Sequence, residues 1–251
     1  MIRIVVVCEA QSDFEIATAL ADRCLMEAID WLESEWLDST RNWLGESSST
    51  PFYAWKSLKK LVKQLKLDVD LPFQSDRVSQ DAFAARRALL IIDHLQEHFD
   101  AVLLIRDSDG VTERTNGLKQ GCDAVQLKQP AVIGVAHTKR ECWVLSGFDP
   151  YNDLEKRLLN EEREYLGFDP VEKPQELTAK HDPQNDKRSA KRVLNKLTQS
   201  NYAREEICWM ETSLNKLRNR VENNGLSAFL NEVQVLLMPL MIRPDARGGR
   251  A

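Results

Sequence analysis

The sequence predicts an α/β fold in which a mainly parallel sheet is flanked by helices and followed by a C-terminal helical extension. Three short apolar runs, at 3–8, 101–106 and 131–136, are typical of strands that are covered on both faces. Segments with apolar residues at helical spacing separate these runs, and this alternation favours a parallel sheet. From about residue 150 the sequence becomes charged and helical, which predicts the extension.

The helices are predicted from the spacing of apolar residues and from capping signals. A long helix is expected from about Phe14 to Leu37, with Ser12 or Asp13 as its cap. The polar, turn-rich stretch that follows it is expected to be a loop. The remaining predicted helices cover 54–67, 79–98 with a Ser79 cap, about 113–127, and a short segment starting near Glu141.

We divide the chain into two parts. Residues 1–150 form the sheet domain, with a helical insertion at about 38–78. Residues 151–251 form a helical extension that is interrupted by prolines and packs on the sheet domain instead of folding separately. The apolar stretch 226–241 is expected to be buried on the sheet, with docking of a partner or a second copy as the alternative.

Composition limits the classes of function. The formal net charge of −5 argues against a protein whose whole surface binds phosphates, although a local basic groove stays open. The apolar run at 4–8 is too short for a signal peptide or a membrane span. The five cysteines are scattered without a CxxC pair, so we expect reduced thiols and a cytoplasmic protein with no membrane partner. His94 and His98 have a spacing that a metal could use, but solvated histidines are favoured.

Acidic residues follow all three apolar runs. Glu9 and Asp13 follow the first run, Asp107 and Asp109 end the second, and Glu141 follows the third. Because ligands bind beyond the carboxyl ends of parallel strands, we expect these carboxylates to meet at one edge of the sheet. Oxygen-only ligands suit Mg²⁺ or Mn²⁺, which would offset their mutual repulsion.

Each of these residues also has an ordinary structural interpretation. Asp107 and Asp109 could belong to a turn before Gly110, and their i, i+2 spacing places both on one side only if the strand conformation continues. Asp13 alone could be a helix cap, and Glu141 a first-turn glutamate. The convergence at successive strand ends favours the metal hypothesis. Ser108, between the aspartates, could orient a water or face the helix layer.

Three motifs resemble one known family. The segments "CEAQSD", "LLIRDSDG" and "HTKRECW" are similar, over roughly residues 1–150, to the motifs of the Toprim fold. They look most like the overcoming-lysogenization-defect (OLD) nucleases and the small stand-alone Toprim proteins of bacterial anti-phage loci. Two departures are Ala10, where the family usually has glycine, and the absence of a GxxxxGK[ST] motif for the ATPase domain of the large members.

The resemblance implies hydrolysis of nucleic-acid phosphodiester bonds, in DNA or RNA, with two Mg²⁺ or Mn²⁺ ions. Glu9 and Asp13 would hold one ion, while Asp107, Asp109 and Glu141 would hold or bridge to the second. It also implies a role as a defence effector, with a separate ABC-type ATPase subunit as a partner; a homodimer is another candidate assembly. The candidates for stabilising charge on the phosphate are Lys139, Arg140, Lys180 and Lys187.

Two other functions stay open. One is a Toprim binding or regulatory module that is catalytically silent or activated by a partner. The other is a phosphotransferase or phosphatase of another α/β fold, which is disfavoured because Glu9 stands where such enzymes carry a nucleophilic aspartate. The basic stretches 56–66 and 187–196 could contact a phosphate backbone, but solvated helix faces are favoured. Core packing or a subunit contact is favoured over base stacking for Trp31, Trp36, Trp43 and Trp55.

Overall fold

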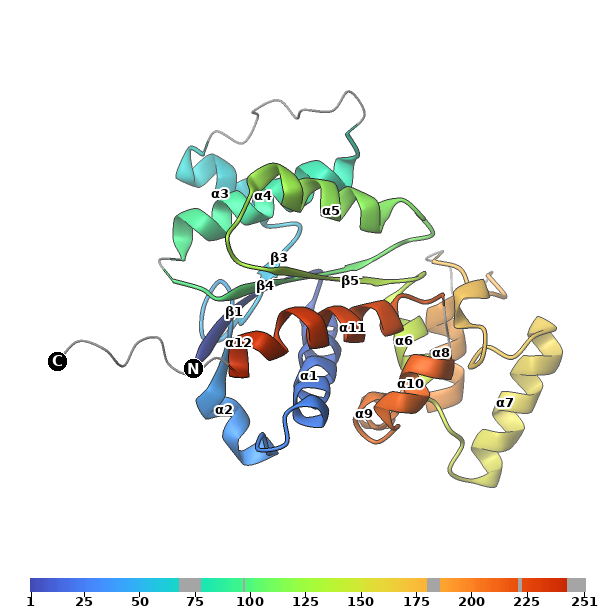
Figure 1. Ribbon diagram of the computed structural model, residues 1–251. Coiled ribbons are helices and arrows are strands. Elements are labelled where there is room, and N and C mark those ends of the chain that lie inside the picture. The colour runs from blue at the N-terminus through green and yellow to red at the C-terminus, as the bar shows by residue number, and fades with distance from the viewer. Residues whose placement is uncertain (68–77, 97, 180–185, 221–222, 243–251) are drawn as a thin grey trace.

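The computed structural model describes residues 1–67, 78–96, 98–179, 186–220 and 223–242. It shows the predicted α/β fold, a parallel sheet between layers of helices with a C-terminal helical part (Figure 1). Three main strands occupy the predicted apolar runs: β1 (Ile2–Cys8), β4 (Ala101–Asp107) and β5 (Ala131–Ala136). Their order in the sheet is β1-β4-β5, and each pair is parallel.

Two more strands follow the first helix: one lies within the stretch expected to be a loop, and the other lies directly after it, where the helix at 54–67 was expected to begin. Both β2 (Arg41–Leu44) and β3 (Tyr53–Ala54) pair in parallel with β1, β2 along its first half and β3 at its end. The prediction of a loop was wrong here because these short strands gain their backbone hydrogen bonds from β1, a partner that local composition does not reveal.

Most helices begin and end near their predicted positions. The first is shorter than expected: α1 (Gln11–Ala28) ends where Ile29 becomes extended, and the chain then turns so that Ile29 and Leu32 are buried. For α4 the predicted cap is confirmed, since Ser79 Oγ accepts a hydrogen bond from the Ala82 amide. The other helices before residue 150 are α2 (Leu37–Thr40), α3 (Leu58–Leu65), α4 (Gln80–Leu95), α5 (Arg114–Val125) and α6 (Arg140–Ser146).

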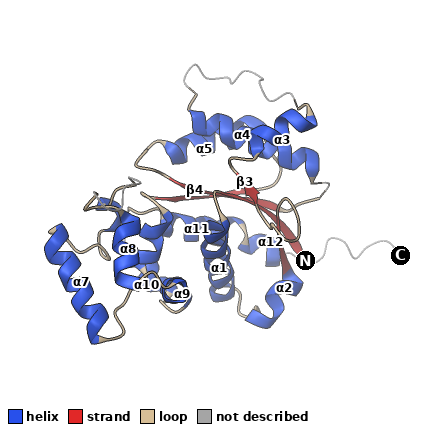
Figure 2. Ribbon diagram, turned by 180° about the vertical axis from the view of Figure 1, so that it is seen from behind, coloured by secondary structure: helices blue, strands red, loops and turns tan. Residues whose placement is uncertain are grey.

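The two faces of the sheet carry separate clusters of buried side chains. Helices α3, α4 and α5 cover one face, and α1 and α11 cover the other (Figures 1 and 2). Side chains alternate along β4, so Leu104 packs on the α4 side, whereas Leu103 and Ile105 pack on the α1 side. The same alternation places consecutive polar residues at the end of β4 on opposite faces of the sheet.

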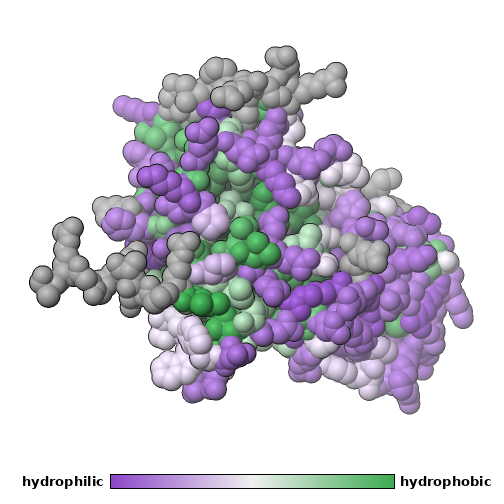
Figure 3. Space-filling view, viewed as in Figure 1, coloured by the Kyte–Doolittle hydropathy of each residue, from purple (hydrophilic) through white to green (hydrophobic). Residues whose placement is uncertain are grey.

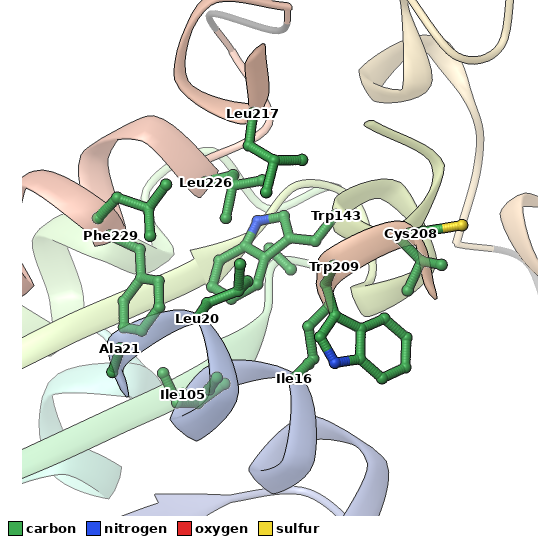
Figure 4. Close-up of a cluster of buried hydrophobic side chains, with 14 of the residues drawn as sticks. Ile16, Leu20, Ala21, Ile105, Trp143, Cys208, Trp209, Leu217, Leu226 and Phe229 are labelled. Atoms are coloured by element: carbon green, nitrogen blue, oxygen red, sulfur yellow. The ribbon is translucent and has the colours of Figure 1, made fainter. Parts of the chain in front are cut away.

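The extension belongs to the same packed body. Its apolar helix α11 lies against β5 and α1, which confirms that the tail is buried on the sheet. The rings of Trp143 and Phe229 stack with centroids 5.1 Å apart within this cluster (Figure 4). The domain boundary at residue 150 stays a prediction. The helices of this part are α7 (Asp153–Leu166), α8 (Ala190–Thr198), α9 (Tyr202–Met210), α10 (Leu214–Arg220), α11 (Leu226–Leu236) and α12 (Met238–Ile242).

The surface of the extension is mostly hydrophilic, whereas hydrophobic side chains gather between α5 and α12 in the middle of the face shown in Figure 3. Within the described ranges, every helix falls short of the length and apolar character needed to cross a bilayer. Helices α6 to α10 lie beyond the carboxyl ends of β4 and β5 (Figure 1), which is the edge where the predicted carboxylates fall.

Candidate active site

A cavity of about 330 Å³ lies at this edge of the sheet. Four predicted carboxylates line it: Glu9 directly after β1, Asp13 in the first turn of α1, Asp107 at the end of β4, and Glu141 in the first turn of α6. They come from the ends of three neighbouring strands and the helices that follow them. Parallel strand ends therefore bring these four side chains together, as the sequence predicts.

Asp107 is the most constrained of the four. Its Oδ1 accepts a hydrogen bond of 2.7 Å from the Arg140 backbone N–H, and its Oδ2 lies 3.3 Å from Lys139 Nζ. Burial nevertheless raises the pKa of Asp107 to about 7, and the negative charges of Asp13, Glu141 and Glu9 add to the rise while Lys139 opposes it. The pKa stays raised because one ammonium group does not offset both the lost hydration and the nearby carboxylates.

Asp13 also combines a hydrogen bond from a backbone N–H with a raised pKa. The N-cap of α1 is Ala10, not Ser12 or Asp13 as predicted, because the helix begins earlier than expected; Asp13, the third helical residue, accepts a hydrogen bond of 2.9 Å from the Ala10 backbone N–H through Oδ2. Burial still raises its pKa to about 6, helped by the charges of Glu9 and Glu141 and opposed by the Ala10 bond and by Arg140. In both carboxyl groups burial is the main cause of the raised pKa, and the neighbouring carboxylates add negative charge that the nearby cations do not fully offset. A bound cation would remove that excess.

Asp109 does not line the cavity. The strand ends at Asp107, and Asp109 has a left-handed backbone with a φ of 50°, so the alternation that would have placed both aspartates on one side stops. Its carboxylate instead lies 2.8 Å from Lys139 Nζ and 2.9 Å from Arg114 Nη1, and these cations lower its pKa against the opposing effect of burial. Ser108 points inward, with Oγ 2.7 Å from His137 Nδ1, and so braces the turn.

The four predicted cations lie in different surroundings or outside the described residues. Lys139 is paired with Asp107 and Asp109, which raise its pKa. Arg140 lines the cavity and pairs with Glu205 at 3.0 Å, while its Nη1 is buried without a hydrogen-bond partner among the described residues. Lys187 lies over the Tyr165 ring, 4.6 Å from its centroid, and does not line the cavity. Lys180 lies outside the described residues.

The extension closes one side of the cavity, with residues other than the predicted Lys180 and Lys187. Glu205 fixes the Arg140 guanidinium from α9, and other polar side chains come from the segment around α8. No local signal distinguishes these residues from ordinary polar positions on amphipathic helices. The residues that line this side are Thr178, Ser189, Lys191, Asn195 and Glu205.

The histidine pair separates in the structure: His94 lies exposed in the last turn of α4, and His98 lies beyond the helix end. In the basic stretch 187–196, Arg192 and Lys196 both pair with the buried Glu162. Solvated or paired helix faces, as favoured from the sequence, account for these features.

The tryptophans divide into two pairs. Trp31 and Trp36 are 53% and 54% exposed, so they are not core residues, and Trp43 and Trp55 are half-buried. Core packing is therefore wrong for Trp31 and Trp36, whereas the subunit contact that was predicted as its alternative stays a prediction.

The donors in the cavity fit a hard divalent cation by type, since they are carboxylate oxygens without thiolate or imidazole. They are not gathered as a preassembled site: no three Asp, Glu, His or Cys side chains converge as metal ligands in the part of the chain that the structure describes. Asp107 makes its contacts with Lys139 and Arg140 instead.

In comparisons with known proteins the chain matches no family model, and no curated protein or solved structure is significantly similar to it.

Proposed function

We propose that the protein is a Mg²⁺- or Mn²⁺-dependent nuclease that hydrolyses nucleic-acid phosphodiester bonds at this cavity with a Toprim-like arrangement of carboxylates. The observation that carries the proposal is the meeting of Glu9, Asp13, Asp107 and Glu141 in one cavity, where two of them have raised pKa values. A cluster of this kind requires a cation when all its members are ionised.

In this proposal Glu9, Asp13, Asp107 and Glu141 hold two divalent ions. When bound, such ions supply a water of lowered pKa and neutralise charge on the phosphate. Asp109 acts only indirectly, by holding Lys139 beside Asp107. Arg140 is the best placed cation for a non-bridging phosphate oxygen, because Glu205 fixes its guanidinium while Nη1 keeps a donor unused by the described residues.

A second candidate is a module that is silent until a partner binds. The specific observation in its favour is that both oxygens of Asp107 are already engaged, one by the Arg140 backbone and one by Lys139. A partner that draws Lys139 away would free the carboxylate for a metal. The two candidates differ in whether the isolated chain cuts nucleic acid.

The role as a defence effector, the separate ABC-type ATPase subunit, the homodimer and the cytoplasmic location follow from the resemblance and composition alone. They remain proposals. An ATPase partner would be added to the cleavage assay as a second component. The resemblance does not choose between DNA and RNA as substrate.

The test is cleavage of plasmid, linear DNA, single-stranded DNA and tRNA by the purified chain with Mg²⁺ or Mn²⁺. Glu9→Gln should abolish cutting, EDTA should do the same, and Glu33→Gln, an exposed glutamate outside the cavity, should leave the rate unchanged. Metal binding without cutting by the wild-type chain would favour the partner-activated module. Absence of both would contradict the metal site itself.

A further inference from the structure

A second pocket, of about 650 Å³, lies at the same edge of the sheet but on the side covered by α3 and α4. Its charged lining is opposite in sign to that of the acidic cavity, with four cations and one carboxylate. We call it the basic pocket. The charged residues that line it are Lys59, Arg87, Arg106, Arg114 and Asp81.

The basic pocket and the acidic cavity are joined through ion pairs. Arg106 Nε, in the pocket, lies 3.8 Å from Glu9 Oε1, in the cavity. Arg114 Nη1 lies 2.9 Å from Asp109 Oδ2, and the other oxygen of Asp109 lies 2.8 Å from Lys139 Nζ at the cavity. The two sites therefore lie side by side around the end of β4.

Arg106 is positioned in advance for an anionic ligand. Its guanidinium lies 5.2 Å from the centroid of the Trp55 ring, and Trp55 Nε1 is itself fixed by a 2.7 Å hydrogen bond to the Ile105 carbonyl. Arg106 Nη1 is 2.9 Å from Asp81 Oδ1, yet Nε and Nη1 are buried without a hydrogen bond of good geometry to any described residue. Arg114 Nε, 3.4 Å from the same Asp81 oxygen, also lacks a hydrogen bond of good geometry, so Asp81 holds both guanidinium groups in the wall of the pocket through ion pairs.

Other cations in the pocket are available. Neither Lys59 nor Arg87 forms an ion pair with a described carboxylate, and Lys59 is exposed. The remaining lining is partly apolar, with Trp55, the 42% exposed Phe83 and the 46% exposed Val111. Cations beside aromatic and apolar surface match a nucleotide, which presents a phosphate and a flat base.

We infer that the basic pocket is a subsite for one nucleotide of a single nucleic-acid strand, adjacent to the scissile phosphate. Its volume suits a nucleotide-sized group and not a duplex. Lys59 and Arg87 bind the phosphate from the mouth of the pocket, Arg106 and Arg114 add positive charge behind them, and the apolar lining packs against the base. The inference rests on the proposed function only in that the acidic cavity receives the neighbouring phosphodiester.

The test is the binding of fluorescein-labelled single-stranded DNA and RNA dodecamers, and a duplex of equal length, measured by anisotropy in EDTA so that no cleavage is needed. The double variant Lys59→Glu/Arg87→Glu should bind single strands at least about tenfold more weakly, and its log–log salt slope should fall by about 1.4, which is about 0.7 for each lost contact. The matched control Lys128→Glu/Arg157→Glu changes exposed cations outside both pockets by the same net charge and should retain wild-type affinity.

Three results would overturn the inference: equal weakening by both double variants, unchanged binding by the pocket variant, or no single-strand preference in the wild type. The neutral pair Lys59→Gln/Arg87→Gln, with melting temperatures for every variant, separates lost binding from misfolding. A wild-type chain that binds single strands but never cuts them would refute the nuclease and leave the pocket standing. If a pocket variant still cuts with metal and binds single strands as tightly as the wild type, only the inference about the basic pocket would be refuted.

Discussion

The acidic cavity and the basic pocket lie on opposite sides of the same strand end. Asp107 enters the first and Arg106 enters the second, because consecutive residues of β4 point to opposite faces. In the cavity, burial together with the charges of neighbouring carboxylates raises the pKa values of Asp13 and Asp107. In the pocket, buried Asp81 ties two arginines together. One strand can therefore provide a place for cations and a place for phosphates side by side, and each can be altered separately.

The largest expected effect is on catalysis. Asp107→Asn removes a carboxylate from the cavity and should lower the metal-dependent cleavage rate by about 10³-fold, or about 4 kcal/mol in the activation barrier. Oligonucleotide binding by this variant in EDTA should be as tight as that of the wild type or tighter, because a negative charge is lost and the basic pocket is unchanged. Initial rates and anisotropy measure the two quantities, with the exposed Asp93→Asn as control. Loss of binding together with activity would show that the two sites are not separable.

The next effect is on stability. Arg106→Gln leaves the buried Asp81 with Arg114 alone, at 3.4 Å, and should lower the free energy of unfolding by about 3 kcal/mol. Urea denaturation measures the change. A double-mutant cycle with Asp81→Asn should recover much of the loss, whereas Arg87→Gln, at the pocket mouth, should cost less than about 0.5 kcal/mol. A loss of similar size in Arg87→Gln would mean that the mouth of the pocket is structural.

A smaller effect concerns pH. The pKa of Asp107 is raised from 3.8 to about 7, so the folded chain holds its proton where the unfolded chain has lost it, and stability falls as pH rises through that window. Asp107→Asn removes this loss. The variant should therefore gain stability relative to the wild type between pH 5 and pH 8, by an amount on the order of 2 kcal/mol. Melting temperatures across this range measure the gap, and saturating Mg²⁺ should narrow it. A gap that does not change with pH would contradict the crowding of carboxylates.

The smallest expected effect concerns Asp109, which lies outside the cavity and touches Lys139 and Arg114. Asp109→Asn should lower the cleavage rate by about tenfold, or about 1.4 kcal/mol, because it loosens Lys139 without removing a metal ligand. Cleavage rates as a function of Mg²⁺ concentration check this, since the metal dependence should stay close to that of the wild type. A loss as large as that of Asp107→Asn would restore Asp109 as a ligand.

Local chemistry along the chain determines several features of this protein. The apolar runs specify β1, β4 and β5, because continuous apolar segments must be buried on both faces of a sheet. The carboxyl ends of parallel strands share one edge, so the positions of Glu9, Asp13, Asp107 and Glu141 along the chain are enough to predict that they meet. The Ser79 cap followed from the same local rules.

Tertiary structure decides the remaining features of the sheet and of the two sites. The left-handed turn at Asp109 depends on where β4 stops, and β2 and β3 exist only because β1 offers them hydrogen bonds. Glu205 reaches Arg140 from a helix 65 residues away in sequence, and the arginines of the basic pocket meet Asp81 across two layers. These contacts join residues that are distant along the chain, and their energies depend on burial and on partners that no local spacing encodes.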